Sequence, residues 1–141
     1  METLAIDLTT YQRRAIEDAH VARMREVGEI KDHAPGDVLI KLGDDIETFF
    51  YVEEGEVEAV HPVTGERYGG ASLGPTQFFA EVSFLNGGRS MMGGRVVEPS
   101  RILHVPRDAM LSLMSQIPEL SDLLITVATC RAAASTSFNA A

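Results

Sequence analysis

Apolar positions at the start of the chain recur at three- and four-residue steps, which is the period of an amphipathic helix. The residues on this face are Leu8, Tyr11, Ala15, Ala19 and Ala22. Thr9 followed by Gln12 fits a capping box at the helix start. The sequence therefore predicts an N-terminal helix that ends at Gly28.

From Gly28 to about Pro106 the period changes to short apolar runs that are separated by turn residues. The clearest runs are 38–40, 49–52, 57–60 and 102–105. Residues suited to tight reversals occur at 35–37, 43–45, 54–56, 64–66 and 74–75, roughly ten residues apart. This spacing predicts several antiparallel hairpins in a sandwich or barrel.

After Pro106 the helical period returns in two segments. The apolar positions are Ala109, Met110, Leu113 and Met114 in the first segment and Ile117, Leu120, Leu124 and Val127 in the second. Pro118 suits the first turn of the second helix. The last four positions have a heptad spacing, which predicts a seam against either the sheet or a partner helix. Residues 132–141 are small and polar, and we expect a flexible tail.

Composition and cysteine content narrow the class of protein. The 141 residues are 45% apolar and 23% charged, as in one globular domain. No apolar run approaches the length of a membrane span, and the first residues show no basic n-region followed by an apolar h-region, so we expect neither a spanning nor a secreted protein. Cys130, the single cysteine, excludes an internal disulfide and a dithiol pair, so we expect a cytoplasmic protein without membrane contact.

Charge argues against direct nucleic-acid binding. The net charge is −9, and the chain has no basic run of the kind that displaces counterions from a duplex. Most of the net negative charge lies in residues 34–81, which we interpret as the solvated face of a half-exposed sheet.

Catalytic and metal-binding patterns are absent from the sequence. His20, His33, His61 and His104 are far apart and form no His-x-His pair, which favours individually satisfied side chains over a metal site. There is no Gly-x-Ser-x-Gly elbow, and Cys130 lies among Ala and Thr like a packing residue. We expect neither enzymatic activity nor a cofactor.

The residues in the turns carry a family resemblance. The segments are PGDVLI (35–40), GD (43–44), FYVEEGEV (50–57), FFAEVSFLNGG (78–88), EP (98–99) and IL (102–103). In this order they resemble the cyclic nucleotide-binding domain family over residues 10–131. The resemblance implies an α+β fold, in which a jelly-roll-like β-roll (a double-stranded β-helix) packs with an N-terminal helix and two C-terminal helices.

The resemblance also implies a site. In the family a short phosphate-binding cassette presents backbone N–H groups to the cyclic phosphate. Glu81 matches the glutamate that binds the ribose hydroxyl. The amides near Val82 and Ser83, with the side chains of Arg89 and Ser90, would hold the phosphate. The last helix would close over the base through Thr126 or Thr129.

The cassette departs from the family pattern at its two ends. Ala80 stands where glycine is usual, and its methyl group would crowd the ribose. The family arginine falls nine residues after Glu81, which is Ser90 here, so Arg89 arrives one residue early. Met91 and the following Met92 replace small residues of the pocket. Loss of the charge-assisted bond would cost roughly 1.5 to 3 kcal/mol.

Gly93 and Gly94 follow the cassette and have two interpretations. Such a pair marks a bulge or bend in a strand. Beside a nucleotide site, it would instead provide room for the ligand.

Two functions follow from the resemblance. The first is a regulatory domain that senses cAMP or cGMP and relays ligand occupancy to an attached domain or effector partner by a population shift. It is similar to the sensor of catabolite-activator-type proteins without the helix-turn-helix, and a homodimer through the C-terminal helix would fit. The alternative is a degenerate domain that acts as an interaction or dimerisation module, of the type fused to thioredoxin-reductase-like flavoproteins.

Overall fold

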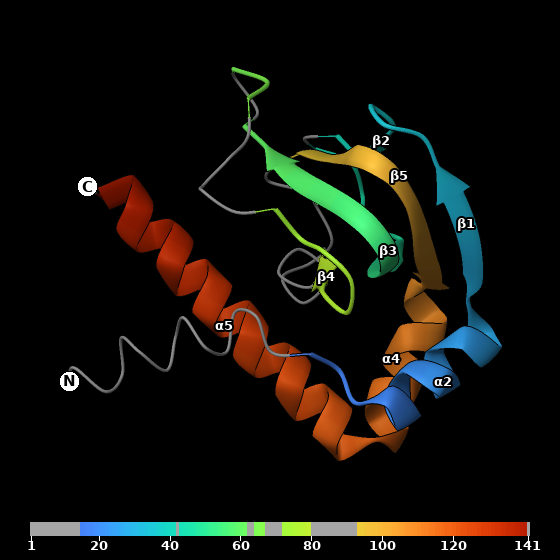
Figure 1. Cartoon of the computed structure of the whole chain (residues 1–141). Helices are drawn as coiled ribbons and strands as arrows, with labels where there is room; N and C mark the ends of the chain where they lie inside the picture. Colours follow the sequence, from blue (N-terminus) through green and yellow to red (C-terminus); the bar gives the residue numbers. More distant parts are fainter. Residues whose placement is uncertain (1–14, 42, 62–63, 67–71, 80–92, 141) are drawn as a thin grey trace.

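The computed structural model describes residues 15–41, 43–61, 64–66, 72–79 and 93–140, with side chains of the last helix described as far as Thr129 (Figure 1). In chain order the elements are α2 (Asp18–Val27), β1 (Glu29–His33), β2 (Val38–Ile40), β3 (Thr48–Val60), β4 (Phe78–Phe79), β5 (Gly93–Pro106), α4 (Arg107–Gln116) and α5 (Pro118–Ala140). The predicted α+β class, a β-roll with helices at both ends of the sequence, is confirmed.

The two long strands β3 and β5 form the centre of an antiparallel sheet. They pair from Thr48 opposite Pro106 to Val60 opposite Gly93. The strand order is β1-β5-β3-β4, and the short β2 pairs with the part of β5 that β1 leaves uncovered. Because β1, β2 and β3 all bond to β5, the curled β5 strand positions most of the sheet (Figure 1).

The turn predicted at residues 54–56 is wrong. Glu54 and Glu56 lie inside the continuous strand β3, where the pairing with β5 shifts register around Gly55. Gly55 has φ +98°, which permits the chain to bulge without reversing direction. The two runs predicted as separate strands, 49–52 and 57–60, are therefore one strand.

The other predicted reversals are confirmed by positive-φ glycines or by hydrogen bonds across the turn. Gly36, Gly43 and Gly65 all have positive φ. In the first turn the amide of Ala34 donates to Asp37 Oδ2 at 3.0 Å. In the last, at Gly74, the amide donates to Gln77 Oε1 at 2.7 Å. In each of these two turns the side chain three residues later accepts the backbone N–H and closes the turn.

The N-terminal helix buries a different face from the predicted one. Ala19 and Ala22 are exposed on α2, where the buried side chains are Val21 and Met24; just before the helix, Ala15 is exposed and Ile16 is buried. The larger side chains remove more apolar surface from water than alanine does, so they define the packed face. The capping box at Thr9 and Gln12 lies outside the described residues. The helix ends at Gly28 as predicted, and a Cβ there would meet the carbonyl oxygen of His104 at 2.7 Å.

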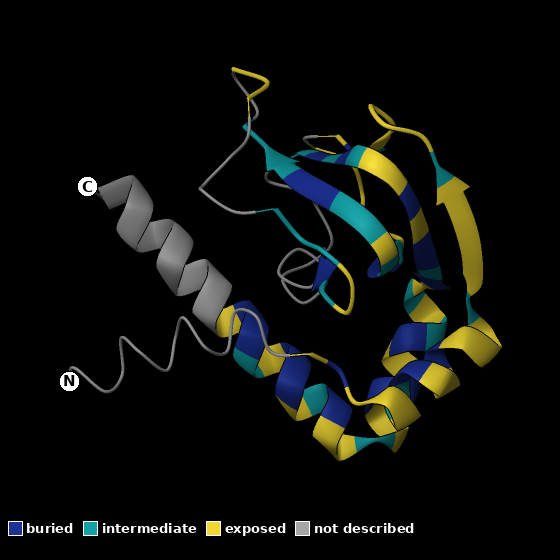
Figure 2. Cartoon of the chain, in the orientation of Figure 1, coloured by how far each residue is buried: buried dark blue, intermediate teal, exposed yellow. Residues whose placement is uncertain are grey.

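The C-terminal helices follow the predicted pattern. Met110, Leu113 and Met114 are buried in α4, and Leu120 and Leu124 are buried in α5 with Val127 (Figure 2). These heptad positions belong to the chain's own hydrophobic core, so the predicted seam is internal. The α5 helix continues through Ala140, and flexibility of residues 132–141 stays a prediction. None of the described helices has the length and apolarity of a membrane span.

Candidate ligand-binding site

The predicted cassette residues Ala80, Glu81, Val82, Ser83, Arg89, Ser90 and Met91 lie outside the described residues. The described chain nevertheless fixes both ends of this segment. It leaves β4 at Phe79, which pairs with Phe50, and returns at Gly93, which pairs with Val60. The segment therefore runs from the end of β4 to the start of β5, and both of these strands pair with the central strand β3.

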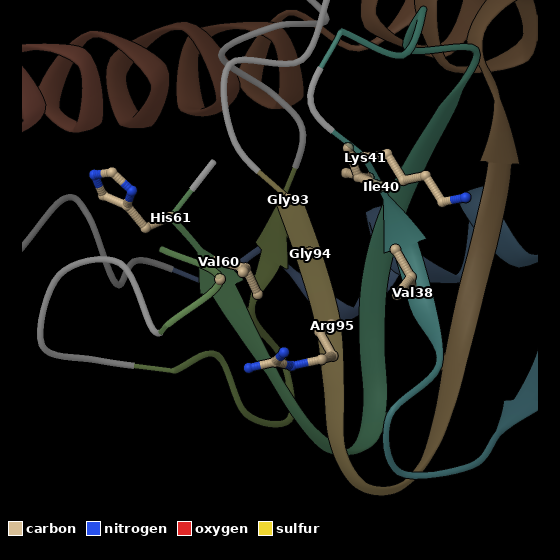
Figure 3. A pocket seen from close by; sticks show the side chains of 9 residues that line it. Val38, Ile40, Lys41, Val60, His61, Gly93, Gly94 and Arg95 are labelled. Carbon is tan, nitrogen blue, oxygen red and sulfur yellow. The ribbon is translucent and has the colours of Figure 1, made fainter. Parts of the chain in front are cut away.

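An open cavity of about 230 Å³ lies where β5 begins (Figure 3). Its lining residues come from β2, β3, β5 and the chain just beyond β2 and β3. They are Val38, Ile40, Lys41, Val60, His61, Gly65, Gly93, Gly94 and Arg95. The cavity thus adjoins the C-terminal end of the predicted cassette.

The glycine pair makes this hollow possible. Gly94 pairs with Ile40 on one side and with Ala59 on the other, so β5 is the middle strand of three. A Cβ on Gly93 would meet the Ile40 carbonyl oxygen at 3.2 Å and Val60 Cβ at 3.5 Å. At these two glycines no side chain covers the β5 backbone, so side chains of the flanking strands, such as Val38 and Val60, border the hollow.

The irregularity that the Gly93-Gly94 pair predicts in β5 is found in the neighbouring strand β2 instead. Gly93 and Gly94 pair with β3 in unbroken register. The irregularity is in β2, where Val38 is opposite Arg95 and Ile40 is opposite Gly94. Of the two interpretations of the glycine pair, the structure thus favours the one that provides space.

Arg95 is held at the cavity by a buried carboxylate. Its Nη2 donates to Glu58 Oε1 at 2.6 Å, and the Glu58 side chain is only 11% exposed. The two residues are directly opposite in the β3–β5 ladder, which fixes their separation. The Arg95 side chain as a whole is 38% exposed.

The other polar lining residues, Lys41 and His61, also extend away from the two glycines. In Figure 3 the Lys41 ammonium extends away from Gly93, and the His61 ring turns away from the strands. The His61 Nδ1 accepts a hydrogen bond from the Thr64 amide at 3.3 Å. Arg95 is therefore the charged group of the cavity whose position the described residues determine most closely.

The structure places the two predicted threonines on α5, away from this cavity. Thr126 is half-buried, and the exposed Thr129 donates its hydroxyl to the Ile125 carbonyl at 2.8 Å. Neither lines the cavity. Closure of α5 over a bound base stays a prediction.

A histidine pair that the sequence analysis missed lies on the same sheet. His33 and His104 were expected to be separate, but their Nε2 atoms are 2.9 Å apart and their rings stack with centroids at 5.1 Å. No sequence pattern indicates this pair, because its two residues lie on β1 and β5 and meet only when these strands pair. Asp37 Oδ2 lies 3.4 Å from His33 Nδ1. Within the described residues, no three His, Cys, Asp or Glu side chains gather to hold a metal ion.

These rings continue into an aromatic row that reaches the cassette. His104 contacts Phe50 edge-on with centroids at 5.0 Å, and Phe50 stacks on Phe79 at 4.7 Å. Phe79 is the last residue of β4. The row therefore connects β1, β5 and β3 with the residue that precedes Ala80.

Comparison with known families shows which protein family the chain belongs to. The model of the cyclic nucleotide-binding domain matches residues 30–117, from β1 to the end of α4. The chain belongs to the cyclic nucleotide-binding domain family. Comparison with curated protein sequences gives no match. This is a regulatory domain family, and the match spans every described strand from Ile30 onward.

Solved structures similar to this cyclic nucleotide-binding domain establish the same fold. The catabolite activator protein of Thermus thermophilus superposes with a TM-score of 0.73 at 20% identity, covering 89% of this chain and 60% of that one. The N-terminal domain of a Streptomyces coelicolor A3(2) transcriptional regulator gives 0.62 at 23% identity, covering 89% and 94%. The regulatory domain of Toxoplasma gondii PKA, solved with cAMP, gives 0.61 at 19%, covering 73% and 40%.

Proposed function

We propose that this domain binds a cyclic nucleotide in the cavity at Gly93 and relays its occupancy to an attached domain or partner. The observation that carries the proposal is the position of the cavity. It adjoins the strand that follows the predicted cassette, in a chain that belongs to the cyclic nucleotide-binding domain family. The Toxoplasma relative was solved with cAMP, which supports a cyclic nucleotide as the ligand class.

The division of roles follows from the chemistry of the ligand. A cyclic nucleotide has an anionic phosphate, a ribose hydroxyl and a flat base. By resemblance, Glu81 would accept the hydroxyl hydrogen bond, and the amides near Val82 and Ser83 would donate to the phosphate with Arg89 and Ser90. The described cavity, open and mostly walled by Val38, Ile40 and Val60, would receive the base.

A relay to the rest of the molecule would begin at β4. A ligand that orders the cassette acts on Phe79, which the aromatic row connects to His104 on β5. The β5 strand leads directly into α4, and α4 into α5. If the nucleotide binds more tightly when these helices are in one of two positions, it shifts the population toward that position. Homodimer formation through α5 would be one way to transmit the change.

Calorimetric titration of the purified domain with cAMP and, separately, cGMP tests this proposal. We expect saturable heat for at least one nucleotide, because a specific site must saturate. Glu81→Ala should weaken binding about tenfold or more, since it removes a hydrogen bond to a charged group. The exposed Glu26→Ala on α2 is the matched control and should bind like the wild type.

Absence of nucleotide binding would contradict the proposal. If neither nucleotide produces saturable heat up to millimolar concentration, the proposal is wrong. The degenerate domain that acts as an interaction or dimerisation module, as in thioredoxin-reductase-like flavoproteins, would then replace it.

A further inference from the structure

The strand β1 forms one edge of the sheet. Of the described strands only β5 pairs with it, and it lies at the outer margin of the sheet (Figure 1). None of the turn and loop backbone hydrogen bonds of the described chain involves residues 29–33. Four of the five residues of β1 are exposed (Figure 2). The described chain therefore leaves one row of β1 backbone donors and acceptors unpaired.

Two large apolar side chains are exposed at this edge. Ile30 is 44% exposed on β1, and Val27, the last residue of α2, is 43% exposed. Ile30 is flanked by Glu29 and Lys31, which form no ion pair with another described residue. The strand thus carries an exposed apolar residue between an acid and a base that both lack an ionic partner in the described chain.

A second copy of β1 in antiparallel register complements this pattern. A two-fold dimer uses the same surface on both copies. With the axis at Ile30, Glu29 of each copy is opposite the partner's Lys31, and Ile30 is opposite its own copy. The two ion pairs lie on one face of the joined sheet, and the apolar contact lies on the other face. One register therefore satisfies all three side chains.

The same charges oppose the neighbouring registers. An axis at Lys31 would place two ammonium groups opposite each other, and an axis at Glu29 or at Asp32 would place two carboxylates opposite each other. Charged residues on an edge strand usually prevent pairing between copies. In β1 they disfavour these three registers and favour the one centred on Ile30, so they select the register of pairing.

We propose that the outer edge of β1 is a dimerisation surface, to which a second copy of this chain adds its own β1 in the antiparallel register centred on Ile30. The two sheets join into one sheet across the dimer. This surface is separate from the cavity, because no residue of β1 lines it. One short strand pair buries little area, so we expect a weak dimer that depends on protein concentration.

Sedimentation velocity from roughly 10 μM to about 1 mM protein measures the self-association. We expect the wild type to dimerise reversibly in this range. Glu29→Lys and Lys31→Glu should each weaken the dimer about tenfold or more, because each variant places like charges opposite each other. An equimolar mixture of the two variants should dimerise like the wild type, since every cross-strand pair in the mixed dimer again has opposite charges.

Glu98→Lys is the matched control. Glu98 is exposed on β5, beyond the part of that strand that pairs with β1. Its variant makes the same change of charge as Glu29→Lys and should dimerise like the wild type. Thermal unfolding of each variant shows whether it is folded, so that a lost dimer is separated from a lost structure.

Cross-linking by a disulfide tests the register. Ile30→Cys is made in a Cys130→Ser background, which removes the single cysteine of the chain. Oxidation with glutathione disulfide should link two copies, because residues opposite each other in an antiparallel pair have Cα atoms about 4.5 to 5.5 Å apart. Asp32→Cys in the same background is the control. Its two copies are more than about 13 Å apart in this register and should not be linked.

Three results would overturn the inference. The first is a wild type that stays monomeric up to about 1 mM protein. The second is a dimer that neither charge reversal weakens, because its interface would then lie elsewhere, for example on α5. The third is a mixture of the two charge variants that does not dimerise, or a cross-link that forms as readily through Asp32→Cys as through Ile30→Cys.

Discussion

Gly55→Ala is expected to lower the free energy of unfolding by about 3 to 5 kcal/mol. Two costs combine at this position. Gly55 has φ +98°, which L side chains rarely adopt, and its added Cβ would lie 2.6 Å from Ser100 Cα on the paired strand. The methyl group would also displace the Ser100 hydroxyl, which donates to Glu98 O and accepts from the Glu56 amide. Urea unfolding monitored by circular dichroism measures the change.

Gly36→Ala provides the matched control for this substitution. Gly36 has φ +91°, nearly the same as Gly55, but a Cβ there would meet nothing within 4 Å. Its cost should be the backbone strain alone, about 1 kcal/mol. If the two variants lost the same free energy of unfolding, close packing of β3 on β5 would not be the main reason that residue 55 must be glycine.

The second large effect is a loss of stability in mild acid that depends on His104. Burial lowers the pKa of His104 to about 4, and the electrostatic influences of Lys31 and His33 act in the same direction. In the unfolded chain an imidazole has a pKa of about 6.5. Between these values the unfolded state binds the extra proton, so stability falls as pH falls through the window from about 6.5 to 4.

Denaturant unfolding at pH 7.5 and pH 5.0 measures this effect. We expect the wild type to lose about 1 to 2 kcal/mol through His104, a discounted value because the ring is only half-buried. His104→Gln should lose less stability over the same interval, since the amide does not titrate. His20→Gln, on α2 and outside the pair, is the control and should follow the wild type. Identical slopes for His104→Gln and the wild type would contradict the prediction.

The physical basis of the second effect is the geometry of the histidine pair. With both rings neutral, one Nε2–H donates to the other Nε2 across 2.9 Å. Two protonated rings would place two donors against each other. Glu29 is opposite His104 on β1 and Phe50 is opposite on β3, so the ionisable groups around the ring are Glu29, Lys31 and His33, with Asp37 beyond His33.

Local sequence signals predicted those features whose causes are local. Gly36 and Gly43 appear in turns because positive φ is a property of a few consecutive residues. The spacing of Met110, Leu113 and Met114 specified a helix face that could pack, and it is buried. The family was also identifiable, because its segments occur in order and at their usual separations along the chain.

Two local patterns were misinterpreted because contacts with other parts of the fold decide the structure there. Glu54-Gly55-Glu56 has the composition of a turn, but Ser100 on β5 holds the segment in a bulged strand. The alanine spacing of the first helix was regular, but Val21 and Met24 provide the larger contact with the core. In each case a tertiary contact outweighed a weak local preference.

By itself the sequence determined the class, the order of elements and the family, because these depend on periodicity and on motifs that are contiguous in the chain. Only the tertiary structure decided which residues meet. His33 contacts His104 and Glu58 binds Arg95 because β1, β3 and β5 are neighbours in the sheet, although 71 and 37 residues separate the two pairs along the chain. The cavity over Gly93 likewise exists because two other strands flank β5. Strand pairing sets these distances, and no local pattern encodes it.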